Sequence, residues 1–153
     1  MKIGFDLDGV ICDINLSLLA VIMRILPEGE WKKQITNLYY SEGKVKIHPE
    51  MFLGLDDEFY IITSRTADLE PVTALWVRKF CPRTKLIMVD QEIPHMHSKE
   101  ELENYREMQA KKKAIEINKL GLDVYFEDSW TVVQRLRQLC PKTKIICFGG
   151  RIE

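Results

Sequence analysis

The stretch KIGFDLDGV, residues 2–10, decides the fold class of this chain, because a short apolar strand in it runs straight into two carboxylates. Asp6 and Asp8 are separated by Leu7 and followed by Gly9, which suits a turn at the strand's end. Open α/β sheets bind ligands beyond the carboxyl ends of their strands, where this pair is expected to lie. Like charges this close resist joint ionisation, so the pair is expected to share a proton or hold a cation.

Four further β-rich runs follow the first, and all five are nearly continuous in apolar residues, as in strands covered on both faces. The five strands are expected at residues 3–7, 59–63, 85–89, 123–127 and 144–148. Apolar stripes with helical spacing lie between them, one at Leu69, Val72, Leu75, Trp76 and Phe80 and another at Val132, Val133, Leu136 and Leu139. This alternation predicts a doubly wound α/β domain with right-handed crossovers.

Local signals mark the ends of another helical region. Ser98 and Glu101 form a capping-box pattern, and Gly121 follows the last helical residues as a glycine C-cap would. The region between them fits either one helix or two. The segments 79–89 and 138–148 share the order helix end, Cys-Pro turn and strand, which indicates a repeated α-to-β unit.

The alternation is interrupted soon after the acidic pair. An apolar helix is expected from Asn15 to Leu26, and an amphipathic one around Trp31, Ile35 and Leu38. We therefore expect a single domain over residues 1–153 with a small helical insert at about 14–55. An insert at this point could roof the acidic pair as a lid.

Composition narrows the class of partner and the compartment. The chain has 153 residues, 46% of them hydrophobic, and a net charge of −1, so no overall field attracts nucleic acid or anionic lipid. The four cysteines lack CxxC spacing, and the first residues lack the pattern of a signal peptide. The apolar run 16–26 is too short to span a bilayer. These features predict a cytoplasmic protein without membrane association.

Three more elements occur at expected strand ends or helix starts. IITSR places Thr63 at the end of the second strand, KKKAIEINKLGLD supplies Lys113, and VYFEDS ends the fourth strand in Glu127 and Asp128. Together with DLDGV, in this order, they resemble the motifs of the haloacid dehalogenase-like superfamily of phosphohydrolases. The resemblance covers the chain from its beginning to the fourth strand. It implies a Rossmann-like three-layer α/β/α sandwich with a five-stranded parallel sheet in the order 5-4-1-2-3 and a small helical cap.

The resemblance also implies a reaction. Asp6 would attack phosphorus and form an aspartyl phosphate, and Asp8 would protonate the leaving oxygen and then activate water. Lys113 would neutralise the charge of phosphate and nucleophile, and the Thr63 hydroxyl would donate to a phosphoryl oxygen. Three further residues would bind substrate, namely Gly9, Ser64 and Arg65. Asp8 favours phosphate esters over haloacids, because the family's dehalogenases lack an acid two residues after the nucleophile.

Mg²⁺ suits a site of carboxylate and carbonyl oxygens. By the resemblance, its ligands would be the Asp6 carboxylate, the Asp8 carbonyl and Asp128. Glu127 stands where the family commonly has an aspartate, so we expect it to hold a metal-bound water rather than to bind the metal directly. The roles of Glu127 and Asp128 could be exchanged.

The expected substrate is a small phosphate ester of open identity. DGVICD, with Asp13 after the acidic pair, resembles the 5′(3′)-deoxyribonucleotidase branch, but the chain is short for that branch and its insert shows no aromatic base-stacking box. Nucleotides, sugar phosphates and nucleic-acid termini remain candidates, although the net charge does not indicate nucleic acid. A small insert leaves the site open to a bulky substrate, or to a lid completed by a second copy in a homo-oligomer.

Other interpretations stay open at this point. The fold could have kept phosphate or nucleotide binding without turnover, or serve as a receiver-like signalling domain, although receivers carry the phosphorylated aspartate on a later strand. Lys111, Lys112 and Lys113 could be a solvated helix face. His95 and His97 are more simply explained as a surface loop than as metal ligands.

Overall fold

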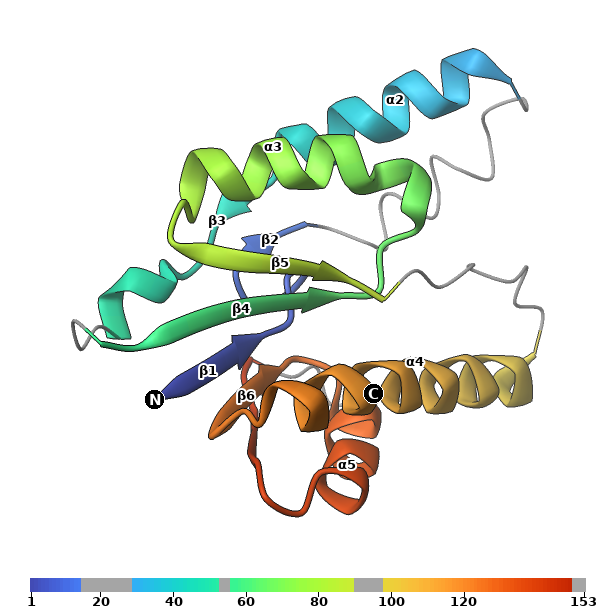
Figure 1. Cartoon of the computed structure of the whole chain (residues 1–153). Helices are drawn as coiled ribbons and strands as arrows, with labels where there is room; N and C mark the ends of the chain where they lie inside the picture. Colours follow the sequence, from blue (N-terminus) through green and yellow to red (C-terminus); the bar gives the residue numbers. More distant parts are fainter. Residues whose placement is uncertain (15–28, 53–55, 90–97, 150–153) are drawn as a thin grey trace.

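The computed structural model describes residues 1–14, 29–52, 56–89 and 98–149 (Figure 1). A five-stranded parallel sheet forms the centre of the described chain. Its strands are β1 (Lys2–Phe5), β4 (Glu58–Thr63), β5 (Thr84–Met88), β6 (Val124–Glu127) and β7 (Lys144–Cys147). The five expected strands are therefore present, each within two residues of its expected ends.

β1 lies in the middle of the sheet, in the order β5-β4-β1-β6-β7. The numbering differs from the expected 5-4-1-2-3 because it also counts two short strands, β2 and β3, which lie outside this sheet. Counted among the five sheet strands alone, in chain order and from the β7 edge, the arrangement reads 5-4-1-2-3. Because all five strands are parallel, their carboxyl ends all lie on the same side of the sheet, which we call its carboxyl edge.

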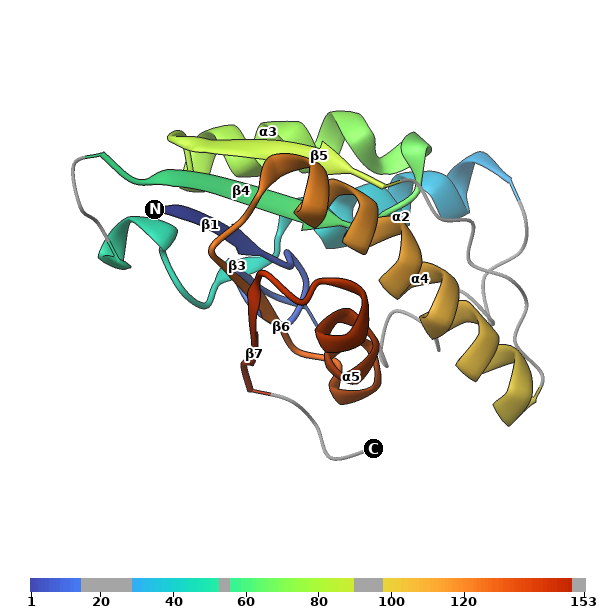
Figure 2. The same ribbon diagram turned by 60° about the horizontal axis from the view of Figure 1, so that its bottom comes forward.

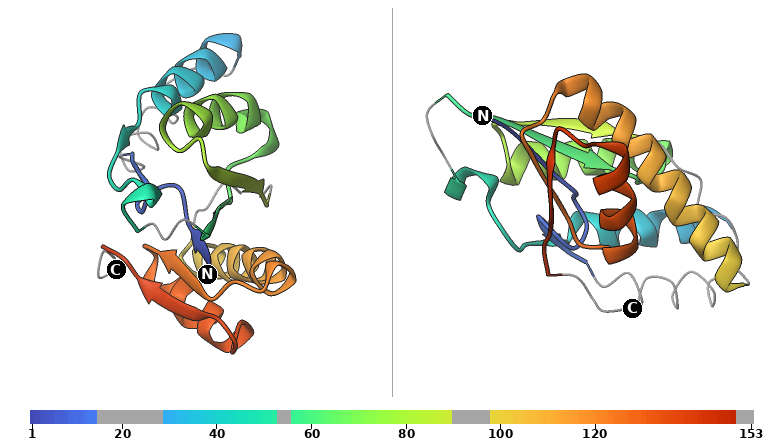
Figure 3. Two further views of the ribbon diagram at one scale, coloured as in Figure 1. Left: turned by 60° about the vertical axis from the view of Figure 1, so that its left-hand side comes forward. Right: turned by 90° about the horizontal axis from the view of Figure 1, so that it is seen from below.

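Helices cover both faces of the sheet, which makes a three-layer α/β/α arrangement (Figures 1 and 3). α2 (Glu30–Ser41) and α3 (Glu70–Phe80) lie on one face. α4 (Lys99–Leu120) and α5 (Trp130–Leu139) lie side by side on the other (Figure 2). Alternate residues of β4 serve the two layers: Phe59 and Ile61 join the core on the α3 side, and Tyr60 and Ile62 join the core on the α4 side.

Local capping signals hold in three dimensions. Ser98 Oγ accepts a hydrogen bond from the Glu101 amide, and Glu101 accepts one from the Ser98 amide. Gly121 ends α4 in the left-handed region, with φ 62°. The region between these residues is one helix rather than two.

Two apolar residues of the expected stripes do not pack on the sheet. Leu75 and Leu139 are exposed, because α3 turns Thr73, Trp76 and Val77 inward and α5 turns Val132, Val133 and Leu136 inward. Each buried stripe therefore contains one residue fewer than the spacing predicts.

The insert is not purely helical, which corrects the expected helical cap. Besides α2 it contains β3 (Lys44–Val45), which pairs antiparallel with β2 (Cys12–Asp13), and a 3₁₀ turn, η1 (Pro49–Phe52). A second 3₁₀ turn, η2 (Ala67–Leu69), precedes α3. The Trp76 indole donates a 2.7 Å hydrogen bond to the Gly43 carbonyl and so fastens the insert to α3.

Some expectations fall on parts of the chain that the structure does not describe. The apolar helix expected at 15–26 lies outside the described residues, and His95 and His97 lie outside them as well. Within the described ranges, no helix is long and apolar enough to cross a lipid bilayer.

Candidate active site

The expected catalytic residues meet where β1, β4 and β6 end at the carboxyl edge of the sheet. The Asp6 amide continues the sheet by donating a 2.8 Å hydrogen bond to the Phe126 carbonyl, which sets Asp6 next to the end of β6. Thr63 ends β4 and Glu127 ends β6. The parallel register thus brings together side chains that are far apart in sequence.

Lys113 supplies the positive charge at the centre of this cluster. Its Nζ lies 2.9 Å from Asp6 Oδ1 and 2.7 Å from Glu127 Oε2, and its side chain is 0% exposed. Burial by itself would lower the pKa of Lys113, but the two carboxylates hold that pKa well above its ordinary value. Lys113 is therefore charged although it is buried. Lys111, on the same helix, is exposed to solvent.

Three carboxylates lie close enough together to bind one divalent cation. Asp6, Glu127 and Asp128 each place one oxygen within 4.8 Å of the others. Burial, followed by repulsion from Glu127, raises the pKa of Asp6 to about 7. Burial, followed by repulsion from Asp6, raises the pKa of Asp128 to about 6. A single lysine does not neutralise three carboxylates, so a hard divalent cation matches both the oxygen donors and the excess negative charge.

Glu127 and Asp128 differ in how far other groups already engage them. Glu127 accepts from Lys113 through Oε2 and from the Ser129 amide, at 3.3 Å, through Oε1. Asp128 lies against the backbone of Gly9: a Cβ added to Gly9 would stand 2.0 Å from Asp128 Oδ2. The Asp128 carboxylate is thus the one pressed against the loop that carries Asp8.

Gly9 and a lysine from the insert shape that loop. Gly9 has φ 86°, a conformation that favours glycine, and its amide donates to the Cys12 carbonyl at 2.8 Å. Lys46, which directly follows β3, donates from Nζ to the Gly9 carbonyl at 2.8 Å. Sequence reasoning missed Lys46, because one exposed lysine beside a two-residue strand carries no pattern that relates it to Gly9.

Asp8 is engaged by Arg65 in the structure. The Arg65 guanidinium donates to both oxygens of the Asp8 carboxylate, from Nε at 2.9 Å and from Nη2 at shorter range. Arg65 is buried, donates to Thr73 Oγ1 at 3.1 Å, and stacks over Tyr40 with 4.3 Å between Cζ and the ring centroid. Bidentate pairing fixes the position and orientation of the Asp8 carboxylate. Thr73 and Tyr40 were not singled out as site residues by the sequence.

Two hydroxyl side chains lie at the end of β4, on its last residue and on the residue after it. Thr63 is buried, and its Oγ1 accepts a 3.3 Å hydrogen bond from the Arg65 amide. Ser64 is 8% exposed, and its Oγ is buried without a hydrogen-bond partner among the described residues. Buried hydroxyls are nearly always hydrogen-bonded in folded proteins, so Ser64 Oγ is available for a ligand.

The comparisons with known proteins concern the fold. No family model and no curated protein matches the chain. A chain in the solved structure of the Pnkp1/Rnl/Hen1 RNA repair complex is similar, with a TM-score of 0.56 and 13% sequence identity. The similarity covers 96% of this chain and 42% of that one, so the chain spans less than half the length of its structural neighbour. At this identity the likeness shows a shared fold.

Proposed function

We propose that this chain is a magnesium-dependent phosphomonoester hydrolase of the haloacid dehalogenase-like superfamily, with Asp6 as its nucleophile. The observation that carries the proposal is the buried contact of Lys113 with Asp6 and Glu127, beside Asp128. A nucleophilic carboxylate, a fixed cation and an acidic metal cradle are the parts that phosphoryl transfer requires.

Asp6 performs the first step of the proposed reaction. One of its carboxylate oxygens forms a bond to phosphorus as the bond from phosphorus to the leaving oxygen breaks. The leaving oxygen takes a proton from Asp8. Lys113 offsets the charge that gathers on the phosphoryl oxygens, and Thr63 and Ser64 donate their hydroxyls to those oxygens. In the second step Asp8 takes a proton from water, which attacks phosphorus and frees Asp6 and phosphate.

Mg²⁺, held by Asp6, Asp128 and the Asp8 carbonyl, would supply further neutralisation of the phosphoryl charge and fix its orientation. In this arrangement Glu127 keeps Lys113 in place and can hold water on the metal. Its contacts with Lys113 and the Ser129 amide support that placement over direct ligation.

The Asp8–Arg65 pair bears on the first step, because both Asp8 oxygens already accept hydrogen bonds from Arg65, whereas proton donation needs one of them to face the leaving oxygen. The proposal therefore requires Arg65 to exchange Asp8 for an oxygen of the incoming phosphate. The same pair favours one alternative, a phosphate-binding module without turnover, since an Asp8 side chain held by Arg65 would not reach the leaving oxygen.

The substrate class is left to experiment among nucleotides, sugar phosphates and nucleic-acid termini. The structural neighbour belongs to an RNA repair complex, which makes a nucleic-acid terminus one of the substrates worth testing here. The identity of the leaving group does not change the chemistry at Asp6.

The test is hydrolysis of p-nitrophenyl phosphate with and without Mg²⁺. We expect metal-dependent turnover that is lost in Asp6→Asn, and rapid-quench trapping of a phosphorylated protein with a ³²P-labelled substrate. Asp13→Asn is the matched control, because Asp13 is exposed on β2 and has no place in the proposed mechanism. Turnover that survives in Asp6→Asn would contradict the proposal, and binding of phosphate without any turnover would favour the non-catalytic module.

A further inference from the structure

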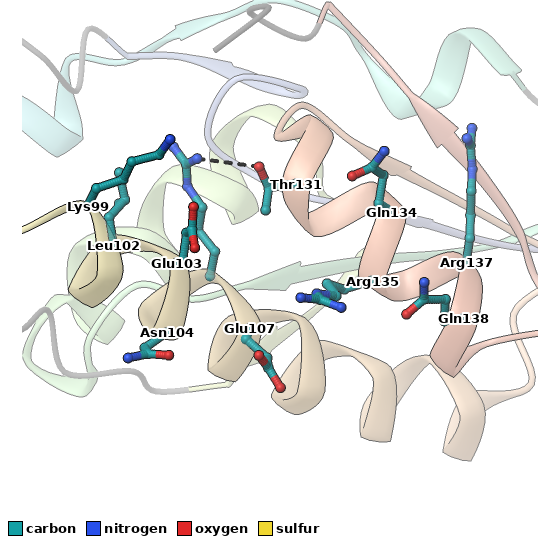
Figure 4. A pocket seen from close by; sticks show the side chains of 11 residues that line it. Lys99, Leu102, Glu103, Asn104, Glu107, Thr131, Gln134, Arg135, Arg137 and Gln138 are labelled. Carbon is teal, nitrogen blue, oxygen red and sulfur yellow. Dashed lines mark hydrogen bonds between the residues drawn. The ribbon is translucent and has the colours of Figure 1, made fainter.

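A polar groove lies between α4 and α5, outside the cluster around Asp6. Its volume is about 940 Å³, and side chains of the first half of α4 and one face of α5 form its two walls (Figure 4). Four cations line it, Lys99, Arg106, Arg135 and Arg137, against two carboxylates, Glu103 and Glu107. Although the whole chain has a net charge of −1, this groove carries an excess of positive charge.

Both helices that form the groove also lead to residues of the proposed active site. Thr131, at the start of α5, lies three residues after Asp128, and Arg106 Nη1 donates to Thr131 Oγ1 at 3.4 Å (Figure 4). Arg106 precedes Lys113 by two turns of α4. The Thr131 end of the groove is therefore the end that lies toward the carboxylates.

An aromatic side chain stands at the same end of α5. Trp130 is 45% exposed, although a large indole is usually covered, and the Arg137 guanidinium lies 5.4 Å from its ring centroid. Trp130 does not line the groove itself, but it shares one face of α5 with Gln134 and Arg137, which do. The Arg137 guanidinium also donates to the Ile145 carbonyl, from Nη2 at 3.3 Å. An exposed aromatic beside a positively charged groove is the combination with which proteins bind single-stranded nucleic acid.

The length of the groove sets the size of the ligand. From Thr131 to Gln138, α5 rises about 10 Å at about 1.5 Å per residue. A stacked strand carries one phosphate per about 3.4 Å, so about three phosphates fit along the groove.

We propose that this groove binds the end of a single-stranded nucleic acid whose terminal phosphate enters the acidic site. The inference rests on the proposed phosphatase function for the last phosphate alone. Arg106, Arg135 and Lys99 contact the internal phosphates, and Trp130 stacks on a base.

The first test compares kcat/KM for p-nitrophenyl phosphate with that for oligothymidylates and oligouridylates of increasing length, each with a 3′- or a 5′-phosphate. We expect kcat/KM to rise with length and level off at about four nucleotides, the terminal phosphate plus about three in the groove. The two sugars and the two termini identify the natural end. A value that does not depend on length would overturn the proposal and leave the phosphatase function intact.

The second test changes the charge of the groove without touching the site. We expect Arg135→Gln to lower kcat/KM for the tetranucleotide, to reduce the slope of log affinity against log salt by about 0.7, and to leave p-nitrophenyl phosphate hydrolysis unchanged. Arg83→Gln is the matched control, because Arg83 is exposed at the opposite, amino end of the sheet. Equal effects of the two substitutions would contradict the assignment.

The third test separates this inference from the proposed function. Fluorescence anisotropy measures the binding of a labelled, unphosphorylated oligothymidylate to wild type and to Arg135→Gln, and needs no turnover. Binding that weakens in Arg135→Gln supports the groove even if no substrate is hydrolysed. Absence of binding, or displacement of the oligonucleotide by poly-glutamate at equal charge, would overturn it, the latter in favour of an acidic peptide.

Discussion

Lys113 places its ammonium group 2.9 Å from the Asp6 carboxylate in a position that solvent does not reach. It lies as close to Glu127, at 2.7 Å, so a single buried cation is shared by two carboxylates, with the third, Asp128, nearby. The cluster is therefore short of positive charge. We expect its stability and its response to pH to follow from that imbalance.

Replacing Lys113 by methionine should lower the free energy of unfolding by about 3–5 kcal/mol, because it leaves buried carboxylates without their partner. Urea denaturation measures the change. Lys111→Met is the control: Lys111 is exposed and pairs with Glu107 across one helical turn, so its loss should cost no more than about 0.5 kcal/mol. Similar losses in the two variants would show that Lys113 is not the buried counter-ion.

The metal-free protein should become less stable as the pH rises from about 4 to about 7. The pKa of Asp6 is raised from 3.8 to about 7 and that of Asp128 to about 6, mainly by burial. In that range the folded protein holds protons that the unfolded chain has released. The free energy of unfolding therefore falls as the pH rises. Thermal denaturation in a chelator, across this range, measures the effect.

Mg²⁺ should reverse that loss above pH 7, since it binds the ionised carboxylates of the folded protein and not the dispersed ones of the unfolded chain. Asp6→Asn should flatten the pH dependence, because it removes the group with the larger shift. A melting temperature that rises with pH in the chelator, or that ignores Mg²⁺, would contradict the metal cradle.

Gly9→Ala should abolish the proposed Mg²⁺-dependent phosphatase activity. The new Cβ would stand 2.0 Å from Asp128 Oδ2, so the carboxylate must move away from the proposed metal position. Gly121→Ala is the matched control: Gly121 also has positive φ, but nothing lies within 4 Å of its added Cβ. We expect the control to lose about 1–2 kcal/mol of stability and keep its activity. Retained Mg²⁺ binding by Gly9→Ala, measured by calorimetry, would remove Asp128 from the ligand set.

Asp8 and Arg65 should be strongly coupled in a double-mutant cycle. The Asp8 side chain is 14% exposed and that of Arg65 is 2% exposed. Arg65→Met therefore leaves a largely buried carboxylate without its partner, and adding Asp8→Asn removes that unpaired charge. We expect a coupling free energy of about 3 kcal/mol from chemical denaturation of the four proteins. Lys85 and Glu58 form a comparable pair at 2.9 Å but on the surface, and should couple by less than about 1 kcal/mol. Equal coupling in the two pairs would contradict a buried, bidentate interaction.

The strands could be predicted from the sequence because a strand buried on both faces consists of a continuous run of apolar residues. Such a run is a local signal. The ends of α4 were equally local, set by the Ser98 box and Gly121. The β2–β3 ribbon was not predicted, because a pair of two-residue strands is too short for any periodicity. Leu75 and Leu139 were placed in apolar stripes by spacing alone, which does not show which side of a helix meets the sheet.

The chain's own order of residues determined which chemical groups stand at the strand ends: carboxylates after β1 and β6, hydroxyls after β4, and a lysine within α4. Only the tertiary structure decided which of these groups touch. It turned Lys113 inward rather than Lys111, gave Lys113 to both Asp6 and Glu127, and paired Asp8 with Arg65. The physical reason is that contact, burial and the resulting shifts in pKa depend on how α4 and the insert pack across the sheet edge, and that packing joins segments that no local pattern relates.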